Sequence, residues 1–173
     1  MELVIETPRL VLRPFVREDV PAVTEITSRP NVSRHMTEMI YDTPEKAEAW
    51  IRMLEGICNI KEPCVVLAIV KKGGRLPIGY IGLHPKDTLD NEVEILYAMT
   101  DAYQNKGYVT EAGKALIRWC FDAAPIPFMA AIVQHSNAPS ARVAQKLGFV
   151  YEGERNLPHN GILTVFRYYR LYA

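Results

Sequence analysis

The chain has 173 residues, a length that suits one domain of ordinary size with a hydrophobic core of its own. Lysine plus arginine and aspartate plus glutamate each number 20, and this balance argues against a protein that binds nucleic acid or an anionic membrane. With 49% hydrophobic residues and no apolar stretch of membrane-spanning length, the composition indicates a globular protein. We therefore predict a single domain over residues 1–173.

The N-terminus begins with acidic residues where a signal peptide needs a basic start. The cysteines are widely spaced, and no Cys/His grouping resembles a zinc site; they are Cys58, Cys64 and Cys120. We expect a cytoplasmic, reduced protein without a metal, in which Cys120 belongs to the core.

The first half of the chain carries one strand signal and two helix signals. Residues 9–14 alternate charged and aliphatic side chains, which is typical of a half-exposed strand. A helix is predicted over residues 17–29, followed by a loop over 32–42. A second helix begins at Thr43-Pro44-Glu45, with a hydroxyl cap, a proline in the first position and an acid in the first turn. Its predicted buried stripe consists of Trp50, Met53, Leu54 and Ile57.

From residue 64 the pattern changes to strands. Residues 64–71 and 76–83 are apolar runs on either side of a glycine-containing hairpin turn at 72–75. A further strand follows at 93–99, and a polar turn at 104–109 then leads into a long amphipathic helix.

The last third of the chain adds three strands and a short helix. We predict a buried strand at 128–133, a helix at 137–147, and two final strands at 149–154 and 163–171 joined by a polar loop at 156–161. This order indicates an α+β domain with a mixed, largely antiparallel sheet, in which the long helix connects two parallel strands. Aromatic residues of the last strand are either core or a dimer surface; they are Phe166, Tyr168, Tyr169 and Tyr172.

The turn before the long helix is a candidate anion site. A glycine turn that feeds a helix start aims several N–H groups and the positive end of a helix dipole at one point, which suits a phosphate or pyrophosphate. The alternative is an ordinary connection in which Gly107 only permits a tight bend, because one glycine is a weak signal.

Three stretches in the right order resemble the GNAT superfamily of N-acetyltransferases. Residues 104–112 (QNKGYVTEA) resemble its acetyl-CoA pyrophosphate loop, R/Q-x-x-G-x-G/A, and residues 137–149 (NAPSARVAQKLGF) match its second signature, N-x-x-S…K-L-G-F. The opening TPRLVLRP at 7–14 is similar to the ribosomal-protein N-acetyltransferase branch. The resemblance implies a sheet of about seven strands flanked by about four helices, with a splayed pair of parallel strands.

The resemblance also implies how acetyl-CoA binds. The pantetheine arm fills the gap between the splayed strands and pairs with the backbone of Tyr97, Ala98 and Met99, where one strand N–H polarises the thioester carbonyl. The diphosphate rests on the loop, with Lys106 adding a positive charge. The implied loop residues are Gln104, Asn105, Lys106, Gly107, Tyr108, Val109 and Thr110.

The second signature and the central strand supply the remaining candidates. By resemblance, Asn137 holds the pantetheine, Ser140 lies near the cofactor sulfur, and Lys146 completes the cofactor-binding set. Ser140 is then a candidate proton donor to the leaving thiolate, unless it is a first-turn hydroxyl that bonds the backbone. Glu94 lies in an apolar strand that would raise its pKa, so it is either a water-mediated base or a solvated or salt-bridged acid.

The chain departs from the family pattern at three positions. Val109 stands where glycine or alanine is usual, which narrows the phosphate site, while Ala144 and Ile132 replace a tyrosine acid and a glutamate base of some members. An α-amino group has a pKa of about 7.7–8.0, whereas that of a lysine is about 10.4, so an N-terminal amine needs less help to lose its proton. The missing base therefore favours a protein N-terminus or another amine of low pKa as acceptor.

These observations predict an acetyl-CoA-dependent N-acetyltransferase in which the amine of a protein or small molecule attacks the thioester directly in a ternary complex. The alternative is a non-catalytic acyl-CoA-binding or sensing module, which the three departures support. We expect a monomer or a homodimer. Candidates for acceptor specificity lie in two loops; they are Arg34, His35, His159 and Asn160.

Overall fold

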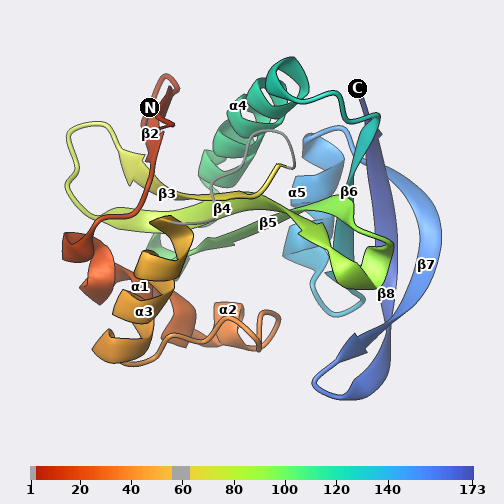
Figure 1. The fold of residues 1–173 in the computed structure, drawn as a ribbon, viewed down its shortest axis with the longest axis horizontal. Coiled ribbons are helices and arrows are strands. Elements are labelled where there is room, and N and C mark those ends of the chain that lie inside the picture. The colour runs from red at the N-terminus through yellow and green to blue at the C-terminus, as the bar shows by residue number, and fades with distance from the viewer. Residues whose placement is uncertain (1–2, 56–62) are drawn as a thin grey trace.

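The computed structural model describes residues 3–55 and 63–173 (Figure 1). The elements of the first half are β1 (Ile5–Glu6), β2 (Leu10–Arg13), α1 (Val20–Ser28), α2 (Pro30–Ser33), α3 (Pro44–Glu55), β3 (Val65–Lys71) and β4 (Pro77–Lys86). The second half contains β5 (Glu92–Met99), α4 (Tyr108–Ala123), β6 (Phe128–Gln134), α5 (Ala138–Lys146), β7 (Val150–His159) and β8 (Ile162–Tyr172). Ile57 and Cys58, which the sequence analysis named, lie outside the described residues.

The strands form one eight-stranded sheet in the order β1-β2-β3-β4-β5-β6-β8-β7. Neighbouring strands are antiparallel except β5 and β6, which are parallel and are connected through α4. This confirms the predicted α+β class with its mixed, largely antiparallel sheet. The strand that the prediction missed is β1, which has two residues and pairs with β2. Among the described residues, no helix combines the length and the apolar character needed to cross a membrane.

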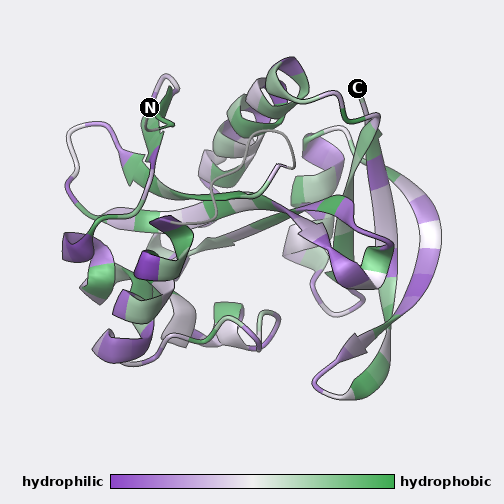
Figure 2. Cartoon of the chain, viewed as in Figure 1, coloured by the Kyte–Doolittle hydropathy of each residue, from purple (hydrophilic) through white to green (hydrophobic). Residues whose placement is uncertain are grey.

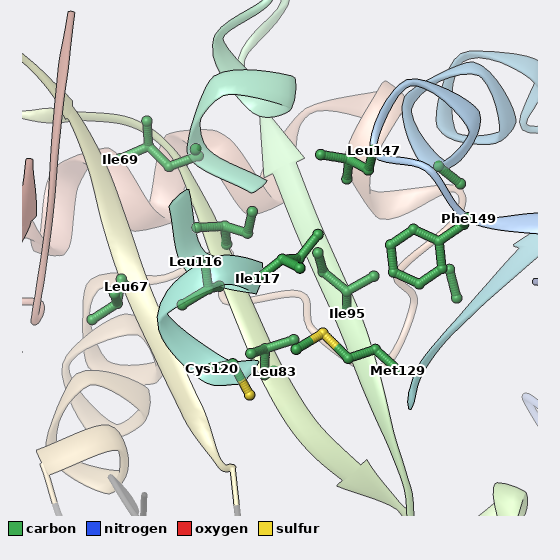
Figure 3. Packing of buried hydrophobic residues seen from close by; sticks show 14 of the residues in the cluster. Leu67, Ile69, Leu83, Ile95, Leu116, Ile117, Cys120, Met129, Leu147 and Phe149 are labelled. Carbon is green, nitrogen blue, oxygen red and sulfur yellow. The ribbon is translucent and has the colours of Figure 1, made fainter. Parts of the chain in front are cut away.

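Helices cover both faces of the sheet. Alternate residues of β3 point to opposite faces, so that Leu67 and Ile69 pack in the cluster with α4 and α5, whereas Ala68 and Val70 pack in the cluster with α1 and α3. Figure 3 shows the first cluster, in which Leu116, Ile117 and Cys120 of α4 lie over the strands. Cys120 is fully buried, which confirms it as a core residue. Figure 2 shows where hydrophilic residues lie outside these hydrophobic clusters, for example on α3 and along β7.

Two details of the first half differ from the prediction. The first two residues of the loop predicted over 32–42 belong to the short helix α2, whose first residue is a proline, a residue favoured at that position. Met53 is 52% exposed and does not belong to a buried stripe, because α3 packs through Ala47, Trp50 and Ile51. The assignment of Met53 to the core was therefore wrong.

The last hairpin is longer than predicted. Most of the predicted loop at 156–161 is strand, since β7 continues to His159 and the turn is only Asn160-Gly161, with positive φ of 53° and 73°. An Asn-Gly pair with both residues left-handed is the strongest short signal of a tight hairpin, and the sequence analysis overlooked it. Phe166, Tyr168 and Tyr169 are buried, whereas Tyr172 is 55% exposed.

Candidate active site

A cavity of about 560 Å³ opens where β5 and β6 part. Along β4 the pairing of β5 is continuous, but within the described chain its parallel register with β6 contains a single pair, Glu94 with Ala130. Beyond that pair, residues of both strands line the cavity, including Tyr97, Ala98 and Met99 of β5. The predicted splayed pair is therefore present, and the strand backbone named for the pantetheine lies in the wall of the gap.

Two amide side chains form hydrogen bonds with the last residue of β5. The Met99 carbonyl accepts hydrogen bonds from Asn31 Nδ2 (3.2 Å) and from Gln104 Nε2 (3.1 Å), so this carbonyl is satisfied within the protein. In contrast, Asn31 Oδ1 is buried and has no hydrogen-bond donor among the described residues. A buried acceptor without a donor costs about 1–3 kcal/mol, and because Asn31 lines the cavity, a ligand N–H would remove that cost.

The predicted anion loop meets the cavity at the N-terminus of α4. Gly107 precedes the helix in a left-handed conformation (φ +77°), and the Glu111 N–H donates to the Gly107 carbonyl (2.9 Å) as the first bond of the helix. The N–H groups of Tyr108, Val109 and Thr110 consequently have no intrahelical acceptor, and all three residues line the cavity. The donors and the helix dipole thus point toward one site, as a phosphate group requires.

The cations near this loop are arranged differently from the prediction. Lys106 Nζ donates to the Ala102 carbonyl (2.8 Å) and lies 5.6 Å from the centre of the Tyr103 ring, and Lys106 is not a cavity-lining residue. The predicted Lys146 does line the cavity, together with Arg142 one turn earlier in α5. Arg142 was not predicted as a site residue, although its spacing from Lys146 places both on one face of the helix.

Tyr97 and Ser140 meet in this cavity. Ser140 lies in the first turn of α5, where its N–H donates to Asn137 Oδ1 (3.1 Å), the cap of that helix. The Tyr97 hydroxyl lies 3.0 Å from Ser140 Oγ and donates to the Ser140 carbonyl at 3.1 Å. Burial raises the pKa of Tyr97 to about 12, so the phenol keeps its proton at neutral pH and acts as a donor. The resemblance assigns a role only to the backbone of Tyr97, so the contact of its hydroxyl with Ser140 is new from the structure.

Glu94 lies at the last paired position before the gap and is ion-paired. Its Oε2 lies 3.3 Å from His84 Nε2 and 3.3 Å from Lys86 Nζ, and its side chain is 10% exposed. The hydrogen bond to Glu94 raises the pKa of His84 against the opposing effect of burial. Of the two readings of Glu94 that the sequence left open, its surroundings are those of a salt-bridged acid in the cavity wall.

At the far side of the cavity, Gln134 bridges two histidines. His35 Nδ1 lies 2.8 Å from Gln134 Oε1, and Gln134 Nε2 lies 3.0 Å from His159 Nε2. Because one end of a carboxamide donates and the other accepts, this arrangement puts the proton of His35 on Nδ1 and the lone pair of His159 on Nε2. The reverse amide orientation exchanges both assignments.

Of the residues predicted to determine acceptor specificity, only some lie together at the cavity. His35 and His159 line the cavity, and Thr37, which the sequence analysis did not name, donates to Asn160 Oδ1 (2.7 Å) beside them. Arg34 is exposed and does not line the cavity. Gln134 was missed because nothing in the sequence pairs it with residues 99 and 25 positions away.

A sheet that opens at a parallel pair, with a glycine-capped helix at the opening, is the arrangement implied by the resemblance to acetyl-CoA-dependent transferases. The family model of the acetyltransferase (GNAT) domain matches residues 9–150, and the chain belongs to this family. It is an acetyltransferase whose acyl donor is acetyl-CoA, as the sequence analysis predicted.

Known acetyltransferases are similar to this protein over most of the chain, in sequence or in structure. The uncharacterized N-acetyltransferase YnaD of Bacillus subtilis (strain 168) is 33% identical over 149 residues, covering 86% of this chain and 84% of that protein. A GNAT-family acetyltransferase from Bacillus anthracis superposes with a TM-score of 0.83 at 27% identity, over 98% of both chains. RimL, an α-N-protein acetyltransferase of a ribosomal protein solved with coenzyme A, shares the fold with a TM-score of 0.82 at 16% identity, over 98% of both chains.

Proposed function

We propose that the protein transfers the acetyl group to the amine of a protein N-terminus, or to another amine of low pKa, by direct attack in a ternary complex. The observation that carries this proposal is the gap between β5 and β6, whose wall joins the donors of the α4 N-terminus to the polar groups around Gln134. Such a cavity holds both reactants at one strand end, and this positioning accounts for a large part of the rate.

Acetyl-CoA supplies the acetyl group as a thioester. The N–H groups of Gly107 to Thr110 are positioned to hold its diphosphate, with Gln104, Asn105 and Lys146 at the margins of the same cavity. Strand groups of Tyr97 and Ala98 would pair with the pantetheine amides, as an added strand does. Lys106 would contribute only if its ammonium left the Ala102 carbonyl. The β-branched Val109 narrows the site, and we therefore expect modest affinity.

Asn137 and Ser140 act at the sulfur end of the cavity. The cap bond uses the Oδ1 atom of Asn137, which leaves its Nδ2 group for a pantetheine carbonyl. Ser140 lies at the N-terminus of α5, where the helix dipole stabilises a departing thiolate. When the Tyr97 hydroxyl turns its proton from the Ser140 carbonyl to Ser140 Oγ, Ser140 can pass its own proton to the departing thiolate while Tyr97 supplies one to the serine oxygen. The proton that the attacking amine releases to water then restores the pair.

The acceptor side contains no free carboxylate in the position that some family members use, because Ile132 occupies it. Glu94 is held by His84 and Lys86, so it would act through water. An amine that is already partly neutral at pH 7 suits such a site. RimL, which shares the fold at 16% identity, acts on a protein N-terminus, in agreement with this acceptor class.

A thiol-release assay over a panel of N-terminal peptides, polyamines and aminoglycosides tests the proposal, paired with calorimetric titration of acetyl-CoA. We expect binding of acetyl-CoA, and turnover that is fastest with peptides carrying a free α-amino group. Tight binding with no turnover on any acceptor would instead support a sensing module, and turnover confined to lysine side chains would contradict the acceptor class.

A further inference from the structure

The opening motif, to which the proposed function gives no role, lies against the anion loop. Thr7 Oγ1 donates a hydrogen bond to Glu111 Oε1 (2.6 Å), and the Arg9 backbone N–H donates to the same oxygen (2.9 Å). Arg9 Nε donates to Glu111 Oε2 (2.6 Å), so the motif engages both carboxylate oxygens. A segment that begins 104 positions earlier in the chain therefore holds the first turn of α4.

The Arg9 guanidinium also contacts the loop on both sides of Gly107. Its Nη1 donates to the Lys106 carbonyl (3.1 Å), and its Cζ lies 4.5 Å from the centre of the Tyr108 ring. The backbone of Arg9 is anchored in turn, because its carbonyl accepts a hydrogen bond from the Lys72 N–H (2.9 Å). The side chain thus links the loop to the start of β2.

We propose that Arg9 is a positioning residue for the anion loop: it holds the loop in the shape in which its N–H groups converge, and it neutralises the carboxylate of Glu111 beside them. This inference rests on the proposed function, since it takes the diphosphate of acetyl-CoA as the ligand of the loop. Arg9 does not line the cavity, which favours an action through the loop over direct contact with the ligand.

Electrostatics explains why Glu111 needs this partner. Glu111 has a side chain only 16% exposed and lies in the first turn of the helix whose N-terminus would receive an anion. Burial alone would raise its pKa, but the hydrogen bonds from Thr7 and Arg9 outweigh burial and lower the pKa, so the group is ionised at neutral pH. Without Arg9, a partly buried negative charge would repel the diphosphate from the same helix turn.

Calorimetric titration of CoA into Arg9→Ala, Glu111→Gln and the double variant tests this role. We expect Arg9→Ala to weaken CoA binding about tenfold, because the loop loses its brace and the Glu111 charge is left unbalanced. In the Glu111→Gln background the same change should cost only about threefold, because no charge remains to repel the ligand. Arg17→Ala is the matched control: it removes the arginine of the Arg17–Glu48 pair (3.2 Å), away from the loop, and should leave CoA affinity unchanged.

Kinetics and a conservative variant separate positioning from a general loss of structure. Arg9→Ala should raise KM for acetyl-CoA with kcat nearly unchanged. Arg9→Lys keeps the positive charge but lacks the planar guanidinium with its several N–H donors, so it should restore part of the affinity. Full CoA affinity in Arg9→Ala, while the wild-type protein binds CoA, would overturn the positioning role alone. Equal losses in both backgrounds would overturn the proposed neutralisation of Glu111. Failure of the wild-type protein to bind CoA would overturn the proposed function with it. If melting curves show that the alanine variant does not fold, Arg9→Lys carries the same comparison, with about threefold weaker binding expected.

Discussion

The Tyr97 hydroxyl lies 3.0 Å from Ser140 Oγ, and this contact joins the central strand to the first turn of α5 across the cavity. In the proposed mechanism this contact provides the proton donor, in a chain that has Ala144 where some family members place a tyrosine. Since burial raises the pKa of Tyr97 to about 12, the phenol is protonated at neutral pH, which fits the proposed role of the pair as a donor and not as a base.

Removing either hydroxyl should therefore slow the chemical step. We expect Ser140→Ala to lower kcat about 100-fold and Tyr97→Phe about tenfold, with KM for acetyl-CoA little changed, because general acid catalysis typically contributes such factors. The thiol-release assay measures both constants. Tyr172→Phe, which removes an exposed hydroxyl bonded to Glu152, is the matched control and should behave as wild type. Full activity of both site variants would contradict the assignment of the proton donor.

Gly107 should be required for both the loop conformation and cofactor binding. Its φ of +77° disfavours any side chain, so we expect Gly107→Ala to reduce the free energy of unfolding by about 1 kcal/mol and to weaken CoA binding. Gly107→Pro should weaken binding further, because proline fixes φ near –65° and removes an N–H. Calorimetry and thermal melting report the two effects.

Gly73 offers the control for that comparison. It also has a left-handed φ (+80°), has no atom within 4 Å of an added Cβ, and lies in the β3–β4 turn. Gly73→Ala should cost similar stability and leave CoA affinity intact. If Gly107→Pro bound CoA as tightly as wild type, the loop would not be the diphosphate site.

Gln134 should control the acceptor and not the cofactor. Gln134→Leu removes the carboxamide between His35 and His159, and we expect kcat/KM for the acceptor to fall about tenfold while CoA affinity is unchanged. Gln145→Leu, on an exposed position of α5, is the matched control. A loss of CoA affinity in Gln134→Leu would place this cluster on the cofactor side instead.

The pair of His84 and Glu94 should make stability depend on pH. Glu94 raises the folded-state pKa of His84 above its ordinary value of 6.5, so the pair contributes fully below pH 6.5, and the contribution fades as pH rises through the raised pKa. His84→Gln should therefore reduce the free energy of unfolding in mild acid and have less effect in alkali. Urea unfolding across this range measures the difference. His135→Gln, which removes the half-exposed His135–Glu154 pair, should show little effect at any pH.

The fold was predictable where the hydrophobic periodicity of a segment agrees with the turn and capping residues at its ends. The Lys72–Arg75 hairpin, the α4 stripe and the Asn137-capped α5 all carry local signals that tertiary contacts then reinforce. The two-residue strand β1 has too few residues to show a period, and Met53 was misassigned because helical spacing alone does not say how wide the covered face is.

The site likewise has a part that was predictable from local sequence and a part that depends on the fold. The loop around Gly107 and the cap at Asn137 are continuous in sequence, so motif spacing located them. Contacts such as Tyr97 with Ser140, or His35 with Gln134, depend on the register of elements 43 and 99 positions apart, which no local pattern encodes. The ion pairs of Glu94 likewise follow from the pairing of β5 with β4, which sets His84 opposite Glu94.

Within residues 3–55 and 63–173, the parting of β5 from β6 after a single pair leaves the end of β5 without a paired strand on the β6 side. A ligand lying there would act as a missing strand, and by mass action any compound that binds only the folded chain raises its resistance to unfolding. The working lifetime of this protein would then follow the supply of its own acyl donor, with starvation for acetyl groups leaving it both idle and easier to degrade.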